Sequence, residues 1–207
     1  MELLAKLLGG IERVKIMRFF LHNTENTFSL NHICEKTKVK SAICRKEMAT
    51  LVSIGFIERK KYTTTILGKT KKDTKVKETI SYKLNQNFPH NQALSDLLFD
   101  FELLDKRELA SRFKNIGRIK LFLVSGVFIN NPKSRVDVLI VGEAINKAKA
   151  DKIFDILSSE LGREVIYSMM DIEEFEYRYK MYDKFVRDIL DTPHESVIDK
   201  ISAKHLF

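Results

Sequence analysis

Two stretches of the sequence carry side chains suited to binding a polyanion. The first, KSAICRK, opens a predicted helix, and its outward positions are Lys40, Ser41, Ala42, Arg45 and Lys46. The second, residues 59–77, sets eight basic residues against one acidic residue: Arg59, Lys60, Lys61, Lys69, Lys71, Lys72, Lys75 and Lys77. Lysine and arginine neutralise phosphate charge, and a guanidinium can hold guanine with two hydrogen bonds. These residue types therefore predict contacts with the phosphates of a nucleic acid.

The distribution of charge along the chain supports the same prediction. Residues 1–90 contain 14 Lys and 4 Arg against 8 acidic residues, a net charge of +10. Residues 91–207 contain 18 basic and 20 acidic residues, a net charge of −2, which recovers the total of +8. This asymmetry predicts two domains, of which the first faces the polyanion.

A third stretch, VSGVFINNPKSRVDVLIV at 124–141, places Asp137 at the start of an apolar strand. Metal-dependent phosphoryl transfer needs several carboxylates around its cations, and here only Asp137 is present beside the guanidinium of Arg135. We expect Asp137 to pair with Arg135, with Lys133 or with a backbone amide.

Other classes of site lack support in the sequence. The five histidines are scattered, no glycine-rich phosphate loop occurs, and Cys34 and Cys44 match no zinc spacing. We expect both cysteines to be small buried hydrophobes, with no metal and no cofactor. No apolar run approaches the roughly 20 residues of a membrane helix. The N-terminus does not resemble a secretory signal, so a cytoplasmic protein is expected.

Hydrophobic periodicity predicts the elements that position the basic residues. Helices are expected at 2–8, 11–23, 29–36 and 40–54. The second carries an apolar stripe of Ile11, Val14, Met17, Phe20 and Leu21, and the fourth has an inner face of Cys44, Met48, Leu51 and Val52. Ser29 is suited to cap the third helix, and Gly55 to end the fourth. Strands beginning at Phe56 and covering 80–84 enclose the basic segment.

The span FSLNHICEKTKVKSAICRKEMATLVSIGFIERK resembles winged helix-turn-helix regulators of bacteria and archaea over residues 10–85. The resemblance lies in the apolar positions, the turn, and the final Gly-aromatic-Ile. It implies that the helix from Lys40 reads DNA in the major groove, while the basic strand pair contacts the backbone. A solvated basic surface and a protein-binding winged helix are the alternatives.

A Pro- and Asn-containing stretch, 85–92, marks a boundary, and a helical connection follows it. The connection is expected to be one long helix or two, with an apolar stripe of Leu94, Leu97, Leu98, Phe101, Leu104, Leu109 and Phe113. This stripe either packs on the second domain or forms the seam of a homodimer.

Beyond the connection, strands are expected at 118–125, 134–142 and 163–170. Helices are expected at 143–162, after Asp171, and up to Pro193, and strands alternating with helices indicate a small α/β domain. Residues 116–191 resemble the minimal nucleotidyltransferase-like fold of the DNA polymerase β superfamily, on the strands of 121–142 and on EVIYSMMDIEEFEYR. That family implies a Gly-Ser turn and paired carboxylates, whereas this chain has Ser125-Gly126 and Arg135. The resemblance also implies a weaker alternative, a nucleotide site in which phosphate contacts come from Ser125, Gly126, Lys133 and Arg135.

Taken together, the sequence predicts an α+β protein in three parts. These are a winged helix-turn-helix domain at 1–88, a helical connection at 89–116, and a small α/β nucleotidyltransferase-like domain at 117–207. We expect a homodimeric DNA-binding transcriptional regulator without enzymatic activity or membrane contact. The alternatives are an active metal-dependent nucleotidyltransferase with an accessory nucleic-acid-binding domain, and a protein-interaction adaptor.

Overall fold

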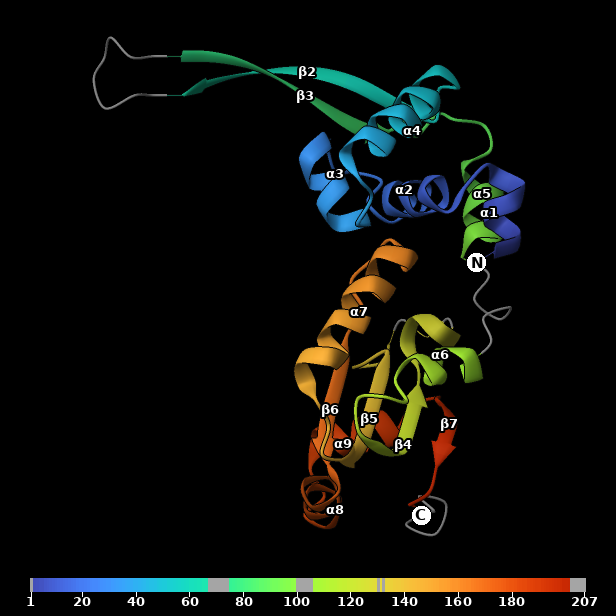
Figure 1. The fold of residues 1–207 in the computed structure, drawn as a ribbon, viewed down its shortest axis with the longest axis vertical. Helices are drawn as coiled ribbons and strands as arrows, with labels where there is room; N and C mark the ends of the chain where they lie inside the picture. Colours follow the sequence, from blue (N-terminus) through green and yellow to red (C-terminus); the bar gives the residue numbers. More distant parts are fainter. Residues whose placement is uncertain (1, 67–74, 100–105, 130, 132, 202–207) are drawn as a thin grey trace. The chain divides into compact units, whose positions relative to one another are not determined.

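The chain has a mixed α+β fold with two small sheets (Figure 1). The computed structural model describes residues 2–66, 75–99, 106–129, 131 and 133–201. Two compact units are distinguished: residues 1–99 with 159–163, and residues 100–158 with 164–207. The division after Phe99 falls inside the segment predicted as a connection.

The first unit contains five helices among its described residues: α1 (Glu2–Leu8), α2 (Ile11–His22), α3 (Leu30–Thr37), α4 (Ser41–Ser53) and α5 (Asn91–Leu98). The predicted cap at Ser29 is confirmed, because its Oγ accepts a hydrogen bond from the His32 N–H at 3.4 Å. Lys38 ends α3 in a left-handed conformation with φ of 55°. Gly55, with φ of 75°, turns the chain after α4 into the following strand.

The sheet of the first unit has the strand order β1-β3-β2 and is antiparallel. Its strands are β1 (Phe28–Ser29), β2 (Ile57–Ile66) and β3 (Lys75–Leu84). Ten residues of β2 pair with ten of β3, so this hairpin is about 33 Å long. Figure 1 shows that it extends well beyond α3 and α4. Strand β1 was not predicted, because two residues are too few to show alternation.

The core of the first unit joins α2 to the helix pair α3–α4. Val14, Met17 and Phe20 of α2 are buried, as predicted. They share a cluster with Ile33, Cys44, Met48, Leu51 and Phe56. The prediction was wrong for Ile11, which is 39% exposed because it is the first residue of its helix and lies at the helix end.

The second unit has a four-stranded sheet in the order β6-β5-β4-β7. The strands are β4 (Arg118–Val124), β5 (Val138–Glu143), β6 (Tyr167–Asp171) and β7 (Glu195–Asp199). β4 is antiparallel to both of its neighbours, and β5 is parallel to β6. The described helices of this unit are α6 (Lys106–Arg112), the short 3-10 helix η2 (Gly126–Ile129), α7 (Lys147–Leu161), α8 (Ile172–Lys180) and α9 (Lys184–Asp191). The end of α7, from Ser159 on, is grouped with the first unit.

Helices cover both faces of this sheet, because alternate residues of a strand point to opposite sides. Leu121 and Leu123 of β4 share a cluster with Phe175 of α8 and with Val186 and Ile189 of α9. Between them in the sequence, Phe122 faces the other way and meets Phe113, just after α6, with ring centroids 5.4 Å apart. The Phe113 ring also lies 4.7 Å from that of Phe154 on α7.

Several elements of the second unit differ from the sequence prediction. Strands β5 and β6 begin at Val138 and Tyr167 instead of 134 and 163, so Asp137 precedes β5 and does not lie within it. Strand β7 was not predicted. Ile198 pairs with Phe122 and Ser196 with Leu123, so Val197 is an extra residue at a bulge, and apolar and polar residues do not alternate along the strand. Helix α7 begins at Lys147 instead of 143. Glu143 still belongs to β5, Ala144 is left-handed with φ of 51°, and the Asn146 carboxamide accepts from the Lys149 N–H at 3.0 Å.

The apolar stripe of 94–113 is divided between the two units. Leu98 is buried in the core of the first unit, whereas Leu109 and Phe113 are buried residues of the second. Leu97 is 41% exposed, and Phe101 and Leu104 lie outside the described residues. The stripe is therefore not one continuous surface. None of the described helices has the length and apolar character needed to cross a bilayer.

Candidate nucleic-acid interface

The first turns of α4 present the residues that the sequence predicted as outward-facing. Cys44, Met48 and Leu51 point into the core. The opposite side of the helix is exposed and carries Lys40, Ser41, Ala42, Arg45 and Lys46. A helix about 10–12 Å across matches a major groove about 12 Å wide, so this face has the size and the side chains needed to contact bases.

The backbone at the start of α4 adds to this positive surface. Lys40 precedes the helix in an extended conformation, with φ of −58° and ψ of 136°, and its side chain makes no capping hydrogen bond. The first N–H groups of a helix have no partner within the helix and carry the positive end of its dipole. A phosphate is a suitable acceptor for such groups.

An ion pair between Arg13 of α2 and Glu47 of α4 holds the two helices together. The Arg13 Nε lies 2.6 Å from Oε2 of Glu47, whose side chain is only 11% exposed. The same guanidinium donates from Nη1 to the Leu8 carbonyl oxygen at 3.1 Å, which includes α1 in the contact. The position of the exposed face of α4 is thus determined by buried contacts on its other side.

The β2–β3 hairpin supplies the second group of basic residues. Arg59, Lys60 and Lys61 are exposed on β2, and Lys60 makes a 3.7 Å ion pair with the equally exposed Glu58. On β3, Lys75 and Lys77 are paired in register with Ile66 and Thr64 of β2. The remaining predicted contacts, Lys69, Lys71 and Lys72, lie outside the described residues.

In the second unit, Asp137 connects three segments through backbone amides. Its Oδ1 accepts from the Val127 N–H at 2.8 Å, and its Oδ2 accepts from the Ile166 N–H at 2.9 Å. The side chain is almost fully buried. Gly126 has φ of +54°, and a Cβ at that position would overlap the Asp137 carboxylate. Of the partners expected for Asp137, the structure therefore shows the backbone amides.

The residues of the alternative nucleotide site are mostly engaged within the chain. Buried Ser125 donates its hydroxyl to the Pro193 carbonyl oxygen at 2.7 Å. The Arg135 guanidinium pairs with the Asp188 carboxylate at 2.5 Å, while Lys133 is exposed. This arrangement does not favour phosphate contacts by Ser125 and Arg135. Within the described ranges, no group of three or more His, Cys, Asp or Glu side chains is placed to hold a metal ion.

The two cysteines lie together in the core between α3 and α4. Cys44 is fully buried, as expected, whereas Cys34 is only half-buried and packs against the edge of the same cluster. Burial, together with the hydrogen bond to the Cys34 thiol, raises the pKa of Cys44 to about 12. Cys44 is therefore a protonated, inert thiol at neutral pH, in agreement with its prediction as a small hydrophobe.

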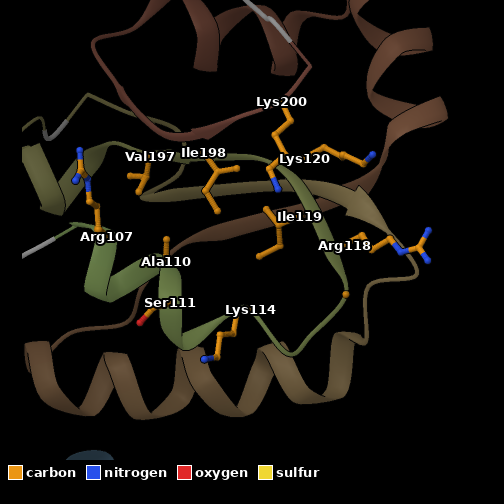
Figure 2. A pocket seen from close by; sticks show the side chains of 11 residues that line it. Arg107, Ala110, Ser111, Lys114, Arg118, Ile119, Lys120, Val197, Ile198 and Lys200 are labelled. Carbon is orange, nitrogen blue, oxygen red and sulfur yellow. The ribbon is translucent and has the colours of Figure 1, made fainter.

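Sequence reasoning missed a second group of basic side chains. They surround a cavity of about 550 Å³ in the second unit, shown in Figure 2: Arg107, Lys114, Arg118, Lys120 and Lys200. These residues are spread over almost a hundred positions. The one signal that could have brought them together was the pairing of β7 with β4, and β7 was not predicted.

Comparisons with protein-family models, with curated proteins and with solved structures find no significant match to this chain.

Proposed function

We propose that the protein is a DNA-binding transcriptional regulator whose first unit is a winged helix-turn-helix. In this proposal α3 and α4 are the helix-turn-helix, and the β2–β3 hairpin is the wing. The observation that carries it is the exposed, basic start of α4, with its uncapped N-terminus, in the same unit as a long basic hairpin. Each feature alone suits a solvated surface, but together they match the two needs of a DNA reader.

The two basic elements would divide the work of recognition. Arg45 lies in the second turn of α4, one turn after the small residues Ser41 and Ala42, which allow the helix to approach the base edges closely. Its guanidinium has the geometry to hold guanine O6 and N7 together. The lysines of the hairpin are point charges on flexible stems, which suits them to phosphate and not to base discrimination.

For the second unit we propose a nucleotidyltransferase-like frame that has lost the metal chemistry of its family. Support comes from Asp137, whose two carboxylate oxygens are both used by backbone N–H groups, and from Arg135 at the position of the expected second acid. The unit would serve assembly, with two copies of the chain presenting two DNA-reading helices to a symmetric site.

Selection of bound DNA tests the proposed function directly. The purified protein, freed of nucleic acid, is incubated with a random duplex library, and bound molecules are amplified and sequenced over several rounds. We expect enrichment of a short motif containing at least one guanine, repeated as an inverted pair if the protein is a dimer. Enrichment of no sequence, together with no retention of duplex at low salt, would favour the adaptor alternative.

A further inference from the structure

The cavity of the second unit lies on one face of its sheet, beside α6. Ile198 of β7 pairs with Phe122 of β4, so the two side chains share a face, and Phe122 meets Phe113, just after α6. Figure 2 shows Ile198 and Val197 across the opening from Ala110 and Ile119. The cavity measures about 550 Å³, within the range of small-molecule sites.

The floor of the cavity is apolar. Ala110 and Ile119 are almost fully buried, with 5% and 8% exposure, and Val197 and Ile198 are half-buried. No aromatic side chain contributes to this lining. The floor is therefore suited to a short aliphatic body, and it offers no platform on which a nucleobase could stack.

The rim of the cavity is cationic. Five of its lining residues are basic, namely Arg107, Lys114, Arg118, Lys120 and Lys200, and none is acidic. This is unexpected for a part of the chain in which 20 acidic residues outnumber 18 basic ones. Like charges gathered around an apolar hollow repel one another, and an anion bound among them relieves that repulsion.

Nearby carboxylates compensate only part of this charge. Glu143 lies 3.2 Å from the Lys120 ammonium and 3.6 Å from the Arg118 guanidinium, so one carboxylate serves two cations. Among the described residues, no carboxylate lies within ion-pair distance of Lys114 or Lys200. Both lysines are exposed, and Figure 2 shows their ammonium groups on different sides of the opening.

From this arrangement we propose that the cavity binds a small organic anion, with a phosphate or carboxylate group among the lysines and a short aliphatic chain on the floor. Charge-assisted hydrogen bonds from ammonium groups would hold the acidic group. Burial of the aliphatic part against Ile119 and Ile198 would add a hydrophobic contribution. This inference is independent of the DNA-binding proposal, because it concerns residues of the second unit alone.

Calorimetric titration of the full chain with octyl phosphate below its micellar concentration tests the proposal. We expect one site per chain, with binding at least about tenfold tighter than for inorganic phosphate or for neutral octyl glucoside. Octanoate in a parallel titration distinguishes a phosphate ligand from a carboxylate ligand, and tight binding of either acid supports the site. Absence of saturable binding by both acids, or equal binding of octyl glucoside, overturns it.

Variants of the full chain locate the binding. Lys114→Glu combined with Lys200→Glu should weaken octyl phosphate binding by at least about tenfold. The matched control, Lys180→Glu with Lys184→Glu, makes the same change in net charge on α8 and α9, which pack on the opposite face of the sheet. A similar loss in the control would contradict the proposal.

A third variant separates a filled cavity from an ion held at its rim. Ile198 is half-buried, and Figure 2 shows its side chain extending towards the opening, so Ile198→Trp keeps every lysine and places a larger side chain in the hollow. We expect Ile198→Trp to weaken octyl phosphate binding but to leave the circular dichroism spectrum unchanged. Full binding by a folded Ile198→Trp protein would overturn the proposal, because the aliphatic chain would then not occupy the cavity.

Discussion

At the scale of single residues, Arg45 carries the proposed sequence preference. It is exposed in the second turn of α4, and a bidentate contact with guanine would be lost in Arg45→Ala. We expect a loss of roughly 1–3 kcal/mol on the selected site and little change on random duplex. Fluorescence anisotropy with both duplexes measures this difference. If the variant kept the wild-type preference between them, base reading would have to be assigned to another residue.

Asp137 gives a second prediction at this scale, on stability. Asp137→Asn places an NH2 group opposite one of two backbone N–H donors, from Val127 or Ile166. Because those donors are buried, the free energy of unfolding should fall by roughly 1–3 kcal/mol. Urea denaturation measures this loss, and DNA binding at low denaturant should be unchanged.

The same variant serves as the control for enzymatic activity. The wild-type protein, incubated with Mg²⁺ and labelled nucleoside triphosphates in the presence of RNA, DNA and small acceptors, should transfer no label. Metal-dependent transfer that disappears in Asp137→Asn would reverse the interpretation and make Asp137 a metal ligand.

The thiol of Cys44 provides a prediction that depends on pH. Its pKa in the folded protein is about 12, above its ordinary value of 9.0, because of burial and the hydrogen bond to Cys34. The folded state thus favours the protonated thiol. This contribution to stability is fully present below pH 9 and decreases as the pH rises towards 12.

Thiol labelling checks this expectation. At pH 8 an aromatic disulfide reagent should modify Cys44 in Cys34→Ser only as fast as the protein opens. Addition of urea should then bring the reaction to the rate of a free thiol. Rapid labelling of Cys44 in the native protein would show that the reagent reaches the thiol without opening of the core, and that α3 and α4 do not bury it.

At the scale of elements, the hairpin is expected to contribute affinity without contributing to the core. Replacing residues 62–79 by Asn-Gly leaves Lys61 and Ile80, which are register partners, on either side of a two-residue turn. The change removes Lys69, Lys71, Lys72, Lys75 and Lys77 but keeps the core residues Ile57 and Leu84. The slope of log affinity against log salt should become shallower by at least about 2.

Thermal unfolding provides the control for the shortened hairpin, and its midpoint should change little. The preference for the selected site should also persist, because α4 is untouched. An unchanged salt slope would show that the removed lysines do not contact phosphate, and it would limit any contribution of the hairpin to Arg59, Lys60 and Lys61, which the variant keeps.

The elements differ in how far the sequence could predict them. Helices α2, α3 and α4 were recognisable because their buried residues recur at helical spacing, and because Ser29 and Gly55 mark their ends by local chemistry. β4 was recognisable from the apolar run of residues 121–124. β1 and β7 were missed, since pairing to distant strands creates them, and the bulge at Val197 removes the alternation.

The candidate sites also differ in how far they could be predicted, depending on whether their residues are close in the sequence or are brought together by the fold. The basic positions 40–46 share one helix, so their common exposure could be predicted from periodicity. The cavity in the second unit could not be predicted, because it combines α6, the start of β4 and the edge strand β7. The role of Asp137 was only partly predictable, since its partner Ile166 is 29 residues away and is brought close by the pairing of β5 and β6.

At the scale of the whole molecule, oligomeric state is the first question. Of the residues predicted to form the dimer seam, Leu98, Leu109 and Phe113 are buried in the cores of the units. Among the described residues of the seam, Leu97 is the one that is exposed. If the seam forms, Leu97→Glu should convert a dimer to a monomer in sedimentation velocity at high micromolar concentration. A wild-type monomer under these conditions would rule out the homodimer.

The last prediction concerns how strongly the intact chain depends on salt. Its excess charge lies in residues 1–90, at +10, while the remainder carries −2, so attraction to DNA should arise in the first unit. If each protomer neutralises roughly four to six phosphates, log affinity for duplex DNA should fall against log salt with a slope of about −4 to −5. Fluorescence anisotropy titrations at salt concentrations from about 50 to about 300 mM measure this slope.

Lys114→Glu with Lys200→Glu should leave the slope unchanged, because those lysines belong to the second unit. A flat response in the wild type would exclude DNA as the polyanion, whereas a slope that decreased in this variant would extend the DNA contact into the second unit.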